Sequence, residues 1–136
     1  MSYLGLDYGA KQVGVAISEG VQAQGLVVLE TKEVIPRLRQ ITKAHQVHVV
    51  VLGLPEGRFK PQVMQFGQEI ETQLGLPVVL WDETLSSRQA QTELVKRHTT
   101  SKRRRVQEHA VAAAAILADY LSEIKTYDKR KKTFSS

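Results

Sequence analysis

The stretch of sequence that decides the fold is LGLDYGAKQVGVAIS, residues 4–18. Two short apolar runs flank a turn that contains Gly9, and this order predicts a β-hairpin. Residues 13–17 show no polar alternation, so we expect the second strand to be buried on both of its faces. The rest of the chain is therefore expected to be built around this hairpin.

Asp7 is the unusual residue of the hairpin, because it places a carboxylate inside the first strand with no basic residue beside it. A buried carboxylate is costly unless it has a partner cation, a hydrogen-bond network or a metal ion. Gly5, Gly9 and Gly14 are expected to leave backbone room nearby, as the close approach of a phosphate or a metal would need. The alternative is a turn residue that only accepts hydrogen bonds from nearby backbone amides.

Length and composition indicate one ordinary globular domain of 136 residues. The chain has no cysteine, which excludes a disulfide framework and a thiolate metal site. It has no apolar run long enough to span a bilayer, and its N-terminus lacks the order of a secretion signal. We therefore expect a cytoplasmic protein.

The net charge of +5 is unevenly distributed along the chain. Eleven of the 19 lysines and arginines lie in 96–105 and 125–132, and the remaining eight face 14 acidic residues. Two concentrations of positive charge are typical of a protein that binds a polyanion such as nucleic acid. The alternative is a solvated loop and a frayed basic tail.

Hydrophobic periodicity predicts three further strands and four helices after the hairpin. The strands are expected at 25–30, 47–53 and 77–81, and the helices at 33–45, 61–74, 86–97 and 107–125. This order predicts an α/β fold with a mixed five-stranded sheet, in which a three-stranded antiparallel part joins two parallel strands and helices flank the sheet. We expect one domain over 1–125, followed by a basic C-terminal tail at 126–136.

A second group of candidate site residues follows the last predicted strand and opens the last predicted helix. Adjacent strand residues point to opposite faces, so at most one of Asp82 and Glu83 can face Asp7, and the longer Glu83 is favoured. Asp82 could instead cap the following helix. Glu108 or His109 could supply a third ligand, unless both are simply polar residues at a helix start. Converging carboxylates would need a divalent cation, and hard oxygen ligands favour Mg²⁺ or Mn²⁺.

Four motifs in order resemble the YqgF family, whose members are described as pre-16S rRNA nucleases and as Holliday-junction-resolvase-like proteins. The motifs are LGLDYGAK at 4–11, GLP at 53–55, DETLSS at 82–87 and AAAAILADYL at 112–121. The resemblance covers about residues 3–124. It implies a ribonuclease-H-like fold, the bacterial cytoplasm and a nuclease that matures the 5′ end of 16S rRNA. By motif match, Asp7 and Glu83 inherit the roles of acidic site residues.

The chain departs from this family at the head of the last helix, where the family usually has an aspartate. Counting back from Ile116 and Leu117 places that position on His109, with Glu108 beside it. Three consequences stay open: Glu108 takes over the role, His109 acts as a ligand or proton shuttle, or catalysis is weakened. A neutral imidazole binds a hard cation less well than a carboxylate does.

The leading hypothesis is a metal-dependent nuclease that acts on pre-16S rRNA or branched DNA, with a homodimer left open. Its catalytic and metal-binding candidates are Asp7, Glu83, Glu108 and His109. Its candidates for phosphate contacts, which would position the substrate without reading its sequence, are Lys11, Arg88, Lys102, Arg103, Arg104 and Arg105. Two alternatives are a nucleic-acid-binding factor without catalysis and a Holliday-junction resolvase. A phosphotransferase of the actin-like group is disfavoured, because such proteins enclose their nucleotide between two domains of this kind.

Overall fold

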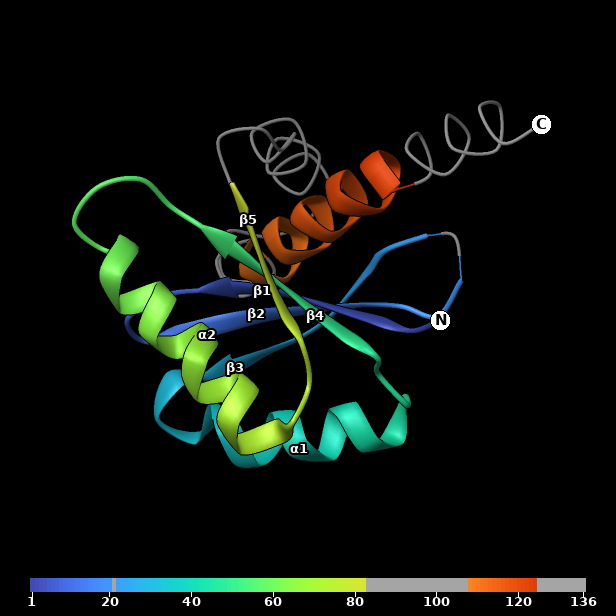
Figure 1. Ribbon diagram of the computed structural model, residues 1–136, viewed down its shortest axis with the longest axis horizontal. Coiled ribbons are helices and arrows are strands. Elements are labelled where there is room, and N and C mark those ends of the chain that lie inside the picture. The colour runs from blue at the N-terminus through green and yellow to red at the C-terminus, as the bar shows by residue number, and fades with distance from the viewer. Residues whose placement is uncertain (21, 83–107, 125–136) are drawn as a thin grey trace.

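A computed structural model describes residues 1–20, 22–82 and 108–124 of the chain. Its five strands form one sheet in the order β3-β2-β1-β4-β5 (Figure 1). β2 pairs antiparallel with both β1 and β3, while β4 pairs parallel with both β1 and β5. The predicted mixed sheet, with three antiparallel and two parallel strands, is confirmed. The strands are β1 Tyr3–Tyr8, β2 Gln12–Ser18, β3 Gln24–Glu30, β4 Val49–Leu54 and β5 Val78–Asp82.

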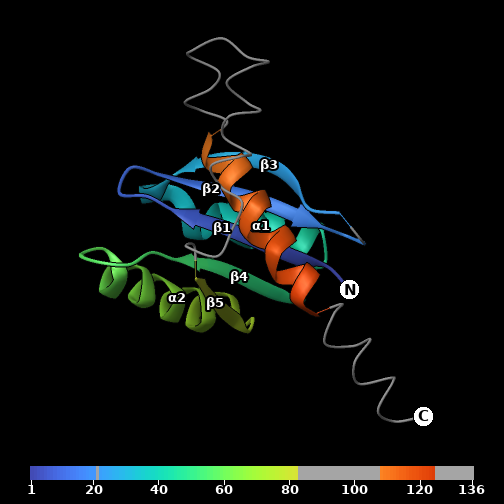
Figure 2. The same cartoon turned by 90° about the horizontal axis from the view of Figure 1, so that it is seen from above.

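Helices cover both faces of this sheet (Figures 1 and 2). The 3₁₀ turn η1 (Thr31–Glu33), α1 (Val34–Ala44) and α2 (Lys60–Leu74) follow one another in the chain, and α1 and α2 lie on one face. A helix described over 108–124 lies across the other face, above β1 and β2. None of the described helices has the length and apolar character needed to cross a membrane.

The alternation of side chains in β1 divides its residues between two hydrophobic cores. Leu4 and Leu6 are fully buried in the core beneath α1 and α2. Gly5 lies against Ala113 and Leu117 of the 108–124 helix, so the alternate residues Tyr3, Gly5 and Asp7 face that helix. Asp7 belongs to this second set, and its position is fixed by the hydrophobic pattern of its neighbours.

The burial of β2 and the helix boundaries agree with the sequence-based expectations. Residues 13–18 of β2 are all buried, as the missing polar alternation predicted. α2 ends at Gly75, whose φ of 68° is the left-handed conformation that glycine adopts readily. β4 begins two residues later than predicted, because the Val47 amide donates to the Thr42 carbonyl oxygen in a turn. The predicted helix at 86–97 and the basic tail at 126–136 lie outside the described residues.

The space beside Gly5 and Gly14 is filled by the chain itself, so the expectation that these two glycines leave room for a phosphate or a metal is wrong, whereas Gly9 lines a pocket. A Cβ at Gly14 would overlap the carbonyl group of His109, and one at Gly5 would lie 2.8 Å from the Ala113 carbonyl oxygen. A Cβ at Gly9 would lie 2.7 Å from the Gln12 carbonyl oxygen. The first two glycines let the backbone of the 108–124 helix approach the sheet closely, and the third tightens the β1–β2 turn.

Candidate active site

Asp7 lies near the carboxyl end of β1, the central strand of the sheet, and is 2% exposed. β4 runs parallel to β1 and ends beside it at Leu54. The carboxyl ends of parallel strands are where α/β proteins usually place their binding sites. A carboxylate buried at this edge needs a partner, since desolvation of an isolated charge is costly.

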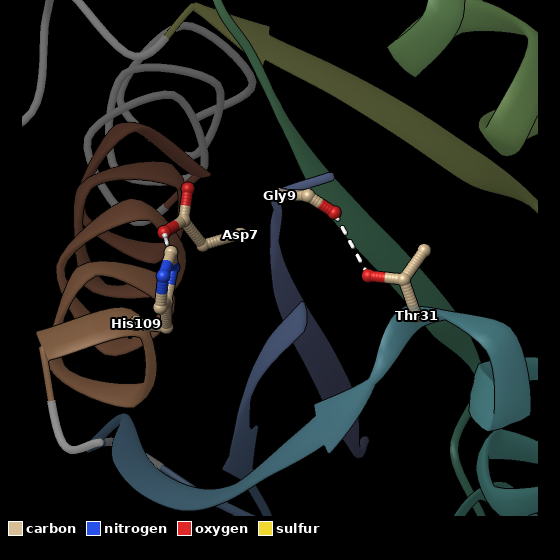
Figure 3. A network of polar contacts seen from close by, with 4 residues as sticks. All are labelled: Asp7, Gly9, Thr31 and His109. Carbon is tan, nitrogen blue, oxygen red and sulfur yellow. Dashed lines mark hydrogen bonds and ion pairs between the residues drawn. The ribbon is translucent and has the colours of Figure 1, made fainter. Parts of the chain in front are cut away.

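His109 is a partner that the structure supplies for Asp7. Its Nδ1 lies 3.1 Å from Asp7 Oδ2, and the two side chains point toward one another (Figure 3). The imidazole is 33% exposed, whereas the Asp7 side chain is 3% exposed, so the pair reaches from the interior to solvent. A ring nitrogen and a carboxylate oxygen at this distance share a proton or a metal ion. The fold thus brings together two candidate residues that are 102 positions apart in the sequence.

A pocket of about 230 Å³ opens beside this pair. The Asp7 carboxylate and the His109 imidazole form its polar part, and the remaining lining is mainly apolar. The lining residues are Asp7, Tyr8, Gly9, Ala10, Pro55, Phe59 and His109. Phe59 was missed by the sequence-based search, although an aromatic residue in the polar loop after the GLP motif is an available signal.

The β1–β2 turn that borders this pocket is held in place by several polar and aromatic contacts. Thr31 Oγ1 donates to the Gly9 carbonyl oxygen at 2.8 Å (Figure 3), and the Thr31 amide donates to the Lys11 carbonyl oxygen at 2.9 Å. Tyr8 packs against Phe66 of α2 with ring centroids 4.6 Å apart. These contacts fix the backbone on which Asp7 is presented, which is what a preorganised site requires.

A second, polar groove of about 590 Å³ shares Ala10 with the pocket. Its wall includes Lys11 and Lys32, both of which are exposed. Lys32 Nζ lies 3.5 Å from Glu30 Oε2, but an exposed pair of this kind is weak and leaves the lysine available to a phosphate. Lys11 was a predicted phosphate contact, whereas Lys32 was not singled out from the sequence.

The strand β5 presents Trp81 to the face that carries Asp7. Trp81 Nε1 donates to Asp119 Oδ2 at 2.9 Å, and its ring lies 5.3 Å from that of Tyr120, both on the 108–124 helix. Strand alternation therefore turns Asp82 toward the opposite face. Burial raises the pKa of the Tyr120 hydroxyl above its ordinary value, and the neighbouring Tyr3 adds a smaller effect in the same direction.

The remaining predicted site residues are only partly covered by the structure. Glu108 is half-buried at the start of the described helix and does not line the pocket beside Asp7. Within 1–20, 22–82 and 108–124, no three histidine, aspartate or glutamate side chains are grouped to hold a metal ion. Six candidates lie outside the described residues: Glu83, Arg88, Lys102, Arg103, Arg104 and Arg105.

The Asp7–His109 pair has the spacing of two neighbouring metal ligands. An octahedral Mg²⁺ holds its ligand atoms about 2.0–2.1 Å away, so adjacent ligand atoms lie about 3 Å apart. The distance of 3.1 Å between Asp7 Oδ2 and His109 Nδ1 matches this separation. The two residues therefore fit a divalent cation as part of its ligand set, and further donors would have to come from beyond the described residues.

A comparison with known families decides what kind of protein carries this site. The family model described as "RuvX: Holliday junction resolvase" matches residues 1–123. The chain belongs to the RuvX family. Curated relatives support the assignment and confirm the resemblance found in the four sequence motifs. A protein of Thermoanaerobacter pseudethanolicus named "Putative pre-16S rRNA nuclease" is 35% identical over 137 residues, which cover 92% of this chain and 99% of that protein.

A further relative and two solved structures complete the comparison. A protein of the same name from Caldanaerobacter subterraneus is 38% identical over 138 residues, covering 92% of this chain and 99% of that protein. Thermus thermophilus RuvC bound to a Holliday junction superposes with a TM-score of 0.61 at 14% identity, covering 88% of this RuvX-family chain and 92% of RuvC. The fowlpox virus Holliday junction resolvase gives 0.56 at 12% identity, covering 91% and 99%. These structures establish the ribonuclease-H-like fold.

Proposed function

We propose that this RuvX-family chain is a nuclease that depends on Mg²⁺ or Mn²⁺, hydrolyses phosphodiester bonds and matures the 5′ end of pre-16S rRNA in the cytoplasm. The observation that carries the proposal is the Asp7–His109 pair, which lies in a pocket beside a lysine-lined groove. Curated relatives at 35% and 38% identity carry the name of pre-16S rRNA nucleases. A buried carboxylate in an open pocket is also a costly arrangement that a purely structural role does not require.

Asp7 and Glu83 would hold the metal ion, together with His109 or Glu108. When bound, the ion would polarise the phosphodiester and lower the pKa of an attacking water. His109 orients the Asp7 carboxylate through its Nδ1 and can hold a proton within reach of solvent, since the imidazole is partly exposed. Lys11 would hold a phosphate beside the pocket and so position the substrate.

The basic residues of 88–105 belong to the same proposal. Arg88, Lys102, Arg103, Arg104 and Arg105 would add phosphate contacts along the substrate. Such contacts strengthen binding to any nucleic acid and leave the choice of cleavage position to the pocket.

The replacement Asp7→Asn tests the proposed function directly. We expect cleavage of a pre-16S rRNA fragment in Mg²⁺ or Mn²⁺ to fall by about 100-fold or more, because an amide is a poor ligand for a hard cation. Asp119→Asn is the matched control: it makes the same change ten residues, or about 15 Å, along the helix from His109. Circular dichroism should show an intact fold for both variants. Full activity in Asp7→Asn would refute the proposed mechanism.

A Holliday-junction resolvase is the second candidate function, because the family model that matches residues 1–123 carries that description. A four-way DNA junction in the same assay separates the two substrates. Salt-sensitive binding of either substrate without cutting would instead favour the non-catalytic factor.

The homodimer remains a prediction, which sedimentation of the full chain tests.

A further inference from the structure

We propose that the pocket beside Asp7 is a subsite for one unpaired nucleobase, which lies against the ring of Phe59 next to the phosphate to be cleaved. The inference rests on the proposed function and adds to it a substrate preference: the nucleotide at the site is outside a duplex. It also assigns Phe59 a role in positioning the substrate.

Phe59 is a large hydrophobic residue that is mostly exposed to solvent at the pocket. It is 57% exposed although it lines a pocket, and the apolar surface it leaves in water is a loss for the free protein. The other exposed large apolar residues of the described chain lie elsewhere and do not line this pocket. An aromatic ring at the mouth of a pocket is the usual means of binding a flat apolar ligand.

The backbone that carries Phe59 is fixed, so the ring is presented from a defined position. Phe59 is the N-cap residue of α2, and its carbonyl oxygen accepts a hydrogen bond from the Val63 amide at 3.0 Å. The loop before it turns at Gly57, whose φ of 97° suits glycine alone. A fixed backbone lowers the conformational entropy that the loop loses on binding, which favours a role in recognition.

The pocket has a polar part and an apolar part, as a nucleotide has a charged phosphate and a flat base. Its polar part is the Asp7–His109 pair, which would face the phosphate and its metal ion, and its apolar part is formed by Tyr8, Pro55 and Phe59. The volume of about 230 Å³ lies below that of pockets for drug-sized ligands and suits a single ring system rather than a base pair. Stacking on an aromatic ring tolerates every base, since each base has a π face.

A base that enters this pocket has to leave its stack and its pairing partner. Extruding a paired base costs free energy, whereas a base in a single strand, a bulge or a frayed end is already available. Binding at this subsite therefore favours unpaired nucleotides. The single residue Phe59 is sufficient for this contact, so the low aromatic content of 6% does not argue against it.

The test measures binding in EDTA, so that it does not depend on cleavage. A short unstructured RNA carries a fluorescent adenine analogue at one position per oligonucleotide, either free or annealed to its complement. We expect the wild-type protein to bind the free strand more tightly and to quench the analogue strongly at one position. Phe59→Ala should weaken binding of the free strand about tenfold and abolish the position-specific quenching, because base stacking on an aromatic ring is lost.

Two further variants make the test specific for the ring. Phe59→Trp should restore both affinity and quenching, because it keeps an aromatic face at the same position. Met64→Ala, at a 42% exposed residue of α2 outside the pocket, is the matched control and should bind like the wild type. Equal affinity of Phe59→Ala and wild type, equal binding of duplex and free strand, or absence of quenching at every position would each overturn the proposal.

The outcome also separates this proposal from the proposed function. Position-specific quenching in a protein that does not cleave would leave the subsite standing and refute the nuclease. Cleavage that depends on Asp7 but is unaffected by Phe59→Ala would refute the subsite and leave the nuclease standing.

Discussion

Replacing Gly14 with alanine should separate the Asp7–His109 pair without touching either side chain. A Cβ at Gly14 would overlap the carbonyl carbon and oxygen of His109 and lie 2.8 Å from the Ala110 nitrogen. Real Cβ atoms essentially never come within 3.0 Å of another heavy atom. The overlapping atoms belong to helix backbone, so a rotamer change cannot relieve the contact, and the start of the described helix has to move away from the sheet.

The expected magnitude follows from these distances. A retreat of about 1 Å relieves most of the overlap and costs about 1–3 kcal/mol of unfolding free energy, as overpacking of a core usually does. The same retreat lengthens the 3.1 Å contact between His109 Nδ1 and Asp7 Oδ2 to about 4 Å, beyond hydrogen-bonding range. We therefore expect Gly14→Ala to remain folded but to lose most of its cleavage activity.

Urea unfolding followed by circular dichroism, together with the rRNA cleavage assay, checks this prediction. Two other glycines give a graded control: a Cβ at Gly25 would lie 3.3 Å from Ala110 Cβ, and one at Gly20 would meet nothing within 4 Å. Stability and activity should fall in the order Gly20→Ala, Gly25→Ala, Gly14→Ala. A Gly14→Ala protein as stable and as active as Gly20→Ala would refute the close approach of helix and sheet.

Three further predictions concern the ligand set, the groove and the far end of the 108–124 helix. His109→Asp should lower the Mg²⁺ concentration needed for half-maximal cleavage, because a carboxylate is a harder ligand than an imidazole. The free energy of unfolding of this variant should also rise with added Mg²⁺. Equal free energies of unfolding in EDTA and in Mg²⁺ would contradict this prediction. Lys11→Ala should reduce the slope of log affinity against log salt by about 1, whereas the control Lys43→Ala on α1 should not. Because the pKa of Tyr120 is raised in the fold, its contribution to stability is complete below the ordinary value of 10.0 and is lost as pH rises through the folded value. Tyr120→Phe should abolish this alkaline loss in pH-dependent unfolding.

The sheet and its helices were predictable because their signals are local. Residues 13–17 lack alternation and are buried on both faces, and Gly75 ends α2 as its position after Leu74 predicted. The strand order followed from the order of hydrophobic segments and from the resemblance. The strands and helix ends depend on residues that are neighbours in the chain, whereas the pairing of β1 with β4 needed the order of the segments and the resemblance.

The details of the site were less predictable because they depend on residues far apart in sequence. Asp7 and His109 were both candidates, but no local pattern states that their side chains lie 3.1 Å apart. Phe59 and Lys32 line the two cavities without any periodic signal, since loop residues are not constrained by helix or strand spacing. Whether Glu83 joins Asp7 stays a prediction, because Glu83 lies outside the described residues.

The sequence correctly indicates that small residues are needed near Asp7, but the group that lies beside them is the 108–124 helix and not a phosphate or a metal. Gly14 pairs with Asp7 across β1 and β2, Gly5 lies two positions before Asp7 on the same face, and the space beside both glycines is taken by the 108–124 helix. That close approach is what brings His109 within 3.1 Å of Asp7, because side chains at these positions would hold the helix farther away. These glycines therefore contribute to the site by allowing the short distance between His109 and Asp7, and not by binding a ligand themselves. It follows that substitutions at Gly5 and Gly14 should affect cleavage even though neither glycine lines the pocket.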